Sequence, residues 1–147
     1  MTWMHQTSLL IWESSQSWAP ALLQLSGGRI RCTVGRDYDE IRRLATQCPY
    51  AVLLWEVNLT NWEDRVVRLR EFLRERTSPA VAIAAENLPP LVVELFLETG
   101  ALIILHDRLD GLVLLRIIER QCPPEQTSMF EWRDLVEIQI PWLVHHP

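Results

Sequence analysis

Short apolar runs alternate with helix-like stretches along most of this chain, and this alternation restricts the fold more than any other feature. The clearest runs are Ser8 to Trp12, Ala80 to Ala85, and the part of Ala51 to Thr60 that precedes Glu56. Their length and lack of polar alternation are typical of strands buried on both faces of a parallel sheet. The pattern therefore predicts an α/β fold with helices on both faces of a parallel sheet.

Helix-start signals precede the amphipathic stretches. Ser17 is placed to cap a helix that ends at a Gly-Gly pair, and Asp37 with Glu40 has the spacing of a capping box. Thr60 and Glu63 repeat that spacing after the third apolar run. We expect helices to begin at these three points.

A second strand, Arg29 to Val34, has a different pattern. Arginine and threonine alternate with apolar residues, which predicts a half-exposed strand at the edge of the sheet. With Leu102 to Leu105 the chain has five predicted strands, joined by right-handed crossovers. An edge position for the second strand favours the order 2-1-3-4-5, which is that of a flavodoxin-like three-layer sandwich.

Composition narrows the classes of function. The 147 residues suit one domain, and no apolar run is long enough to span a membrane. Three widely spaced cysteines and the lack of an evident secretory signal favour the cytoplasm. The net charge of −5 argues against nucleic-acid binding. All 14 basic residues are arginines, which excludes a P-loop or Schiff-base lysine.

Acidic side chains follow several of the predicted strands. Glu13, Glu56, Glu86 and Asp107 each stand where an apolar run ends. In the order 2-1-3-4-5 the first and third strands are neighbours, so Glu13 and Glu56 should lie side by side at the carboxyl edge. Sheets of this kind bind ligands at that edge.

The third predicted strand ends in the turn Glu56-Val-Asn-Leu-Thr. This turn resembles the Asp-Ile-Asn-Leu-Pro turn in the receiver domain of bacterial two-component response regulators, with Glu56 at the phospho-accepting aspartate, and the resemblance extends from about residue 8 to residue 121. Glu13 falls on the first residue of the family's acidic pair and Ser14 on the second. Gly100-Ala101 matches the Gly-Ala before the fifth strand.

The resemblance also implies what this chain has lost. Ala84 stands where the family has a threonine or serine, and Asp107-Arg108 stands near its conserved lysine. Phosphoryl transfer to a carboxylate needs a divalent cation and positive charge around the transition state. We therefore expect a degenerate receiver, or pseudo-receiver, that is not phosphorylated, is not an enzyme and uses no metal or cofactor.

The last two predicted helices, Leu91 to Thr99 and Leu109 to Cys122, have more aliphatic side chains than one sheet face can bury, and the first of them is apolar almost all round. We predict a receiver-like domain over residues 1–122 and a C-terminal extension over 123–147 that packs on this domain or on a partner subunit. Large exposed apolar patches mark interfaces, so we expect a homodimer or a signalling protein partner. The candidate interface residues are Leu91, Val92, Leu95, Phe96, Leu112, Leu115, Trp132 and Trp142.

An alternative interpretation is a flavodoxin-like domain that binds a small ligand or metal, and is possibly an enzyme. It would use Glu13, Glu56, Glu86 and Asp107 at the carboxyl edge. The connection after the first strand, Glu-Ser-Ser-Gln-Ser-Trp, has no glycine-rich phosphate loop, which counts against nucleotide or flavin binding.

Overall fold

The five predicted strands form one parallel sheet in the order β2-β1-β3-β4-β5 in a computed structural model that describes residues 7–75 and 80–121. This order and the flavodoxin-like fold class are those predicted from the sequence, and both are confirmed. The strands are β1 (Leu9–Trp12), β2 (Cys32–Gly35), β3 (Val52–Val57), β4 (Val81–Ala85) and β5 (Ile103–Leu105).

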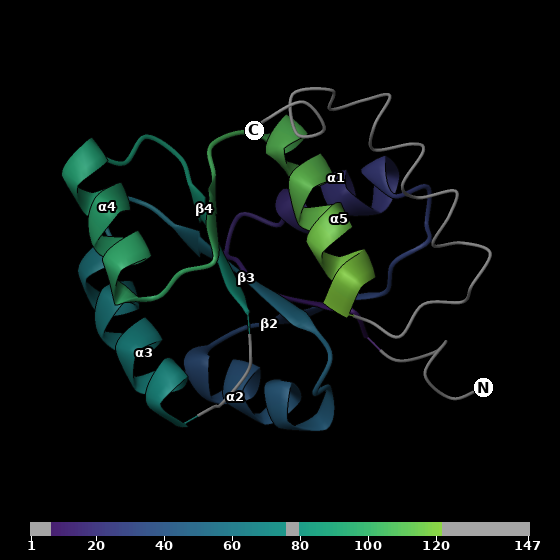
Figure 1. Cartoon of the computed structure of the whole chain (residues 1–147), viewed down its shortest axis with the longest axis horizontal. Coiled ribbons are helices and arrows are strands. Elements are labelled where there is room, and N and C mark those ends of the chain that lie inside the picture. The colour runs from purple at the N-terminus through teal and green to yellow at the C-terminus, as the bar shows by residue number, and fades with distance from the viewer. Residues whose placement is uncertain (1–6, 76–79, 122–147) are drawn as a thin grey trace.

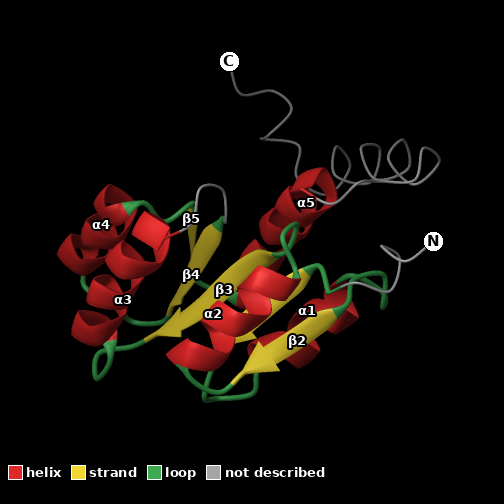
Figure 2. Cartoon of the chain, turned by 90° about the horizontal axis from the view of Figure 1, so that it is seen from below, coloured by secondary structure: helices red, strands yellow, loops and turns green. Residues whose placement is uncertain are grey.

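Helices cover both faces of the sheet. α1 and α5 lie on one face, and α2, α3 and α4 lie on the other, as Figures 1 and 2 show. The helices are α1 (Trp18–Leu25), α2 (Tyr38–Gln47), α3 (Trp62–Glu75), α4 (Pro90–Thr99) and α5 (Gly111–Gln121), with a short 3₁₀ helix, η2 (Arg108–Asp110), before α5. No helix in the described part of the chain is long and apolar enough to cross a bilayer.

Alternation along the strands produces two cores. In β1, Leu9 and Ile11 face α1 and α5, whereas Leu10 and Trp12 face α2, α3 and α4. Trp12 meets Trp55 of β3 edge to face, with ring centroids 5.0 Å apart. Both tryptophans are therefore core residues, and the residue after each points to the opposite face of the sheet.

The edge strand β2 begins later than predicted, at Cys32 rather than Arg29. Two glycines with positive φ, Gly27 and Gly28, carry the chain out of α1. The N–H of Arg29 then donates to the carbonyl of Ser26 at 3.3 Å, so this residue belongs to the turn.

One of the three predicted capping residues caps its helix, and the other two do not. Asp37 caps α2 by accepting from the N–H of Glu40, as the capping-box spacing predicts. Thr60 does not cap α3, because its hydroxyl donates to Asn58 Oδ1 at 2.6 Å. Asn58 and Asn61 bond each other instead, with the N–H of Asn58 2.8 Å from Asn61 Oδ1.

The interface prediction is wrong for two of its residues, because they are buried. Phe96 is fully buried beneath α4, and Leu115 is only 3% exposed in the core beneath α5, so neither offers a surface to a partner. Both are core residues, because each side chain points from its helix toward the sheet. Leu91 is exposed, and the remaining described candidates are half-buried against the chain's own cores: Val92, Leu95 and Leu112. Trp132, Trp142 and the extension 123–147 lie outside the described residues.

Candidate functional site

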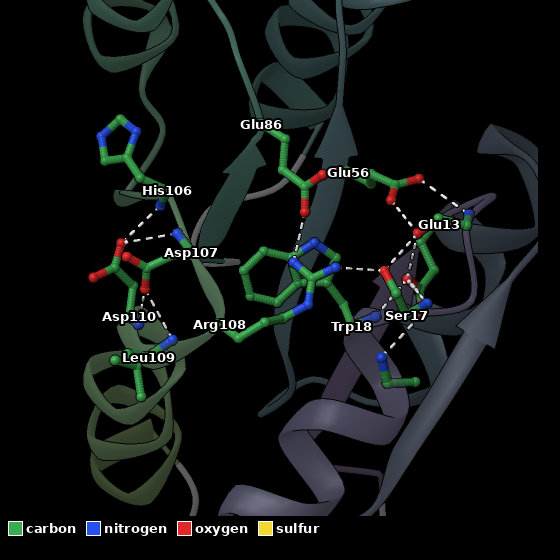
Figure 3. A network of polar contacts seen from close by, with 12 residues as sticks. Glu13, Ser17, Trp18, Glu56, Glu86, His106, Asp107, Arg108, Leu109 and Asp110 are labelled. Carbon is green, nitrogen blue, oxygen red and sulfur yellow. Dashed lines mark hydrogen bonds and ion pairs between the residues drawn. The ribbon is translucent and has the colours of Figure 1, made fainter.

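Glu13 is a buried carboxylate that caps the amino-terminal end of α1. It follows β1 directly and accepts hydrogen bonds from the N–H groups of Ser17 at 3.0 Å, Trp18 at 2.9 Å and Ala19 at 3.0 Å. Figure 3 shows these contacts. A negative charge at this end of a helix satisfies its unpaired N–H groups and complements its dipole. Glu13 thereby takes the capping role predicted for Ser17, whose side chain makes no capping bond.

Glu56 stands beside it, on the neighbouring strand. Trp12 and Trp55 are paired in the β1–β3 register, so Glu13 and Glu56 leave the sheet at adjacent positions, as predicted. Glu56 Oε1 accepts from the N–H of Ser14 at 3.0 Å, the hydroxyl of Ser14 at 3.1 Å and the N–H of Ser15 at 3.2 Å. Its Oε2 accepts from the hydroxyl of Ser15. Both oxygens of this carboxylate are therefore engaged.

These contacts shift the acidity of Glu56. Partial burial raises the pKa of this carboxyl group, but the hydrogen bonds from Ser15 and Ser14 outweigh that effect and lower it below the usual glutamate value. The carboxylate is thus held in its charged form.

One loop supplies the donors to both glutamates. Ser14 and Ser15 face Glu56, and the residues from Ser17 onwards face Glu13. Between the two sets lies Gln16 with φ of 57°, a left-handed conformation that is uncommon outside glycine. The reversal at Gln16 lets a short connection turn its N–H groups toward two different acceptors.

Arg108 supplies the positive charge of this edge. It lies in η2, and its two terminal nitrogens reach Glu86 Oε1 at 2.6 Å and the hydroxyl of Ser17 at 2.7 Å. The guanidinium carbon lies 4.2 Å from the centroid of the Trp18 ring. Arg108 therefore joins the β4–α4 connection to the start of α1, as seen at the centre of Figure 3.

Asp107 turns away from this network. Its carboxylate caps η2 by accepting from the N–H groups of Leu109 at 2.9 Å and Asp110 at 3.1 Å. Asp110 in turn accepts from the N–H of Asp107 at 3.3 Å, which completes a capping box, and also from the N–H of His106 at 2.7 Å. Of the predicted pair Asp107-Arg108, the arginine is the residue that reaches the edge.

Ala84 completes the set of predicted site residues. It is paired with Glu56 in the β3–β4 register and is fully buried. Its methyl group offers no hydroxyl at this position. Glu13, Ser14, Glu56 and Ala84 are thus brought together, whereas Asp107 is separated from them by Arg108.

The edge has three polar residues that were not among the predicted site residues: Ser15, Ser17 and Arg108. Their roles depend on the turn at Gln16 and on the reach of an arginine from η2. A sequence signal existed only for Arg108, which lies near the position of the family's lysine. Among the described residues, no three His, Cys, Asp or Glu side chains are grouped closely enough to hold a metal ion.

Cys32 lies in β2, half-buried beside the core under α1 and α5. Burial, and to a smaller extent the charge of Glu13, raises the pKa of its thiol to about 11. At neutral pH the group is therefore a thiol rather than a reactive thiolate. This agrees with a packing role.

Known proteins match this chain in structure rather than in sequence. No protein-family model matches it, and no curated protein matches it significantly. Among similar solved structures is a CheY-like protein, tadZ, from Pseudomonas aeruginosa PAO1, with a TM-score of 0.64 and 14% identity over 78% of this chain and 99% of that one. The fold is that of a receiver domain.

Two further structures with the receiver fold give the same result. FixJ-N aligns with a TM-score of 0.62 and 12% identity, covering 80% of this chain and 93% of its own. A response regulator from Thermotoga maritima aligns with a TM-score of 0.60 and 13% identity, covering 79% and 98%. The resemblance to receivers that the sequence suggests is thus confirmed at the level of the fold.

Proposed function

We propose that this chain is a receiver-like regulatory domain that accepts no phosphoryl group and acts through contacts with other proteins. The receiver fold supports a signalling role of this kind, by analogy with structures of the same architecture. The single observation that carries the proposal is the state of Glu13 and Glu56, the two carboxylates at the carboxyl edge.

Both carboxylates are already occupied as hydrogen-bond acceptors. Glu13 accepts from the first turn of α1, and Glu56 accepts from Ser14 and Ser15. Magnesium binds with near-octahedral geometry to oxygen ligands, so it would have to compete with these N–H and O–H donors for the carboxylate oxygens. Without that cation, the phosphoryl oxygens and the developing charge would lack their main source of stabilisation.

The positive charge at the edge supports the same conclusion. Arg108 spans Glu86 and Ser17 and stacks on Trp18, so its guanidinium is committed to contacts within the fold. A receiver that is phosphorylated needs a cationic side chain free to meet the transferred group. The chain therefore combines the architecture of a receiver with carboxylates and an arginine that are already engaged within the fold, and we expect this edge not to support phosphoryl transfer.

Incubation with acetyl phosphate and magnesium, followed by intact-protein mass spectrometry, tests this proposal. We expect no phosphoryl adduct under conditions in which a phosphorylatable receiver, included as a positive control, is fully modified. An adduct that forms on the native chain and disappears in Glu56→Gln would overturn it.

A further inference from the structure

We infer that the carboxyl edge is a docking surface for a segment of a partner protein that combines apolar and basic side chains. This inference rests on the proposed function and names the chemistry of the partner. Two properties of the edge carry it: the position of the exposed leucines and the sign of the charge around them.

The most exposed large apolar side chains of the described residues gather at this edge. Leu91 is 80% exposed, Leu109 71% and Leu59 59%. Leu59 lies in the β3–α3 connection, Leu91 in the first turn of α4 and Leu109 in η2. These three segments follow β3, β4 and β5, which are consecutive in the sheet. Parallel strands bring such connections to one side of the domain, so the three leucines lie at the same edge as the network of Figure 3, in which Leu109 is drawn.

The charge of the same edge is acidic. Arg108 is the basic side chain at the centre of Figure 3, and the carboxylates of Glu13, Glu56 and Glu86 lie around it. Asp107 and Asp110 add two negative charges in the neighbouring η2 turn, where they accept from backbone N–H groups. Interfaces favour opposite potentials on the two partners, so lysine or arginine on the partner complements this edge.

The edge is also held in one arrangement before any partner arrives. Arg108 ties the β4–α4 connection to α1, and Glu56 ties the β1–α1 loop to β3. A surface that is ordered in advance loses less conformational freedom on binding. The hydrogen bonds of Glu13 and Glu56 are made within the chain, so a partner can cover them without leaving them unsatisfied.

Two other exposed leucines provide a matched control surface. Leu97 lies near the end of α4 and Leu102 directly before β5, so both are at the amino edge of the sheet, and each is 47% exposed. They have the same chemistry as the leucines of the carboxyl edge but a different location. Substitutions at the two edges therefore separate a specific surface from general stickiness.

Selection of a random peptide library displayed on phage against the full chain tests the inference. We expect the selected peptides to combine leucine, isoleucine or aromatic residues with arginine or lysine. Synthetic versions should bind at least tenfold more weakly to Leu91→Arg and Leu109→Arg, which remove an apolar contact and oppose the basic partner, and equally well to Leu97→Arg and Leu102→Arg. Urea denaturation should show all four variants to be folded, because each position is exposed.

Peptides that bind the carboxyl-edge variants as well as the native chain would overturn the inference, as would a selection that enriches no peptide. A self-association of the native chain that Leu91→Arg abolishes in sedimentation velocity would also overturn it, because a second copy would then occupy the edge. Failure of the proposed function is separately visible as a phosphoryl adduct. A chain that shows neither adduct nor edge binding contradicts the docking inference alone.

Discussion

At the scale of single residues, two glutamates at strand ends owe their environment to one loop. Glu13 and Glu56 project from adjacent strands, and the N–H groups between Ser14 and Ala19 are divided between them. Two like charges at neighbouring positions would repel each other if they were exposed to one another without compensation. The donors around each carboxylate supply that compensation.

Removal of the Glu13 carboxylate should destabilise the fold. In Glu13→Ala the first three N–H groups of the α1 turn lose their acceptor in a buried site, and we expect the free energy of unfolding to fall by about 2 kcal/mol. Urea denaturation measures this loss. Glu63→Ala, at an exposed acidic position in the first turn of α3, should change stability by less than about 0.5 kcal/mol. Equal effects of the two substitutions would contradict the capping role of Glu13.

Ser15 should control the titration of Glu56. Because its hydrogen bond helps to lower the pKa of Glu56, we expect that pKa to be higher in Ser15→Ala than in the native chain. Carboxyl carbon NMR measures it directly. Ser26→Ala, which removes a hydroxyl bonded to the carbonyl of Leu23, should leave the Glu56 titration unchanged. An unchanged Glu56 pKa in Ser15→Ala would count against the assigned cause.

The same shift fixes the sign of the pH dependence. A lowered folded pKa stabilises the protein above the unfolded glutamate value of about 4.3, and this contribution is lost as pH falls through the folded pKa. The difference in stability between the native chain and Ser15→Ala should therefore be larger at neutral pH than in strong acid. A difference that grows on acidification would contradict this account.

At the scale of secondary-structure elements, Arg108 connects parts of the chain that are distant in sequence. It reaches from η2 to the β4–α4 connection through Glu86 and to α1 through Ser17 and Trp18. The planar guanidinium presents separate terminal nitrogens to two acceptors while its face lies on a ring, whereas an ammonium group would have to reach both acceptors from one nitrogen. The Arg108 and Glu86 side chains are partly exposed, so their ion pair adds little to stability. The main effect of Arg108 is to fix the relative positions of these elements.

Arg108→Ala should loosen the edge more than it lowers stability. We expect a loss of about 1 kcal/mol in the free energy of unfolding, because an exposed ion pair and one cation–π contact are each of modest strength. Amide hydrogen exchange should become faster in the β4–α4 connection and in the first turn of α1. Arg108→Lys should show nearly the same acceleration, since lysine cannot span both partners.

The control for this prediction is Arg43→Ala, at an exposed arginine of α2 whose ion pair with Glu40 is 3.7 Å long. It should leave exchange at the carboxyl edge unchanged. Full retention of native exchange rates in Arg108→Lys would show that charge alone, rather than the forked geometry, holds the connection.

The starts of the helices show how much local sequence patterns can predict. Asp37 and Glu40 were predicted correctly because a capping box involves only residues three apart. Thr60 has the same capping-box spacing and Ser17 is a favoured capping residue, but the N–H groups near these helix starts donate to Glu13 and to Asn58 instead. Competition between several polar side chains near one helix start is not decided by spacing alone.

At the scale of the whole molecule, hydrophobic patterning predicted the strands and one edge of the sheet, and the strand order followed from the fold class that this edge position favours. The alternating pattern around Cys32 identified the edge strand, and uninterrupted apolar runs identified the central ones. The burial of Phe96 and Leu115 was not predicted, because a helix that is apolar almost all round does not reveal which stripe faces the sheet. The Arg108 network lay beyond sequence reasoning because it needs the folded positions of three connections.

The central claim is that the carboxylates of Glu13 and Glu56 accept hydrogen bonds from the chain itself and therefore do not bind a cation. The most direct measurement is a titration of the ¹⁵N-labelled full chain with magnesium chloride, followed by NMR of its backbone amides. The reporting amides are those of Ser14, Ser15, Ser17, Trp18 and Ala19, with Gly100 at the opposite edge as a control for general salt effects.

We predict that the five reporting amides will shift no more than Gly100 as magnesium rises into the millimolar range. Their acceptors, Glu13 and Glu56, keep the hydrogen bonds with which the cation would have to compete. A saturable shift at Ser14 and Ser15 that a chelator reverses would contradict this account, because it would show magnesium bound to the carboxylates of a functioning receiver edge.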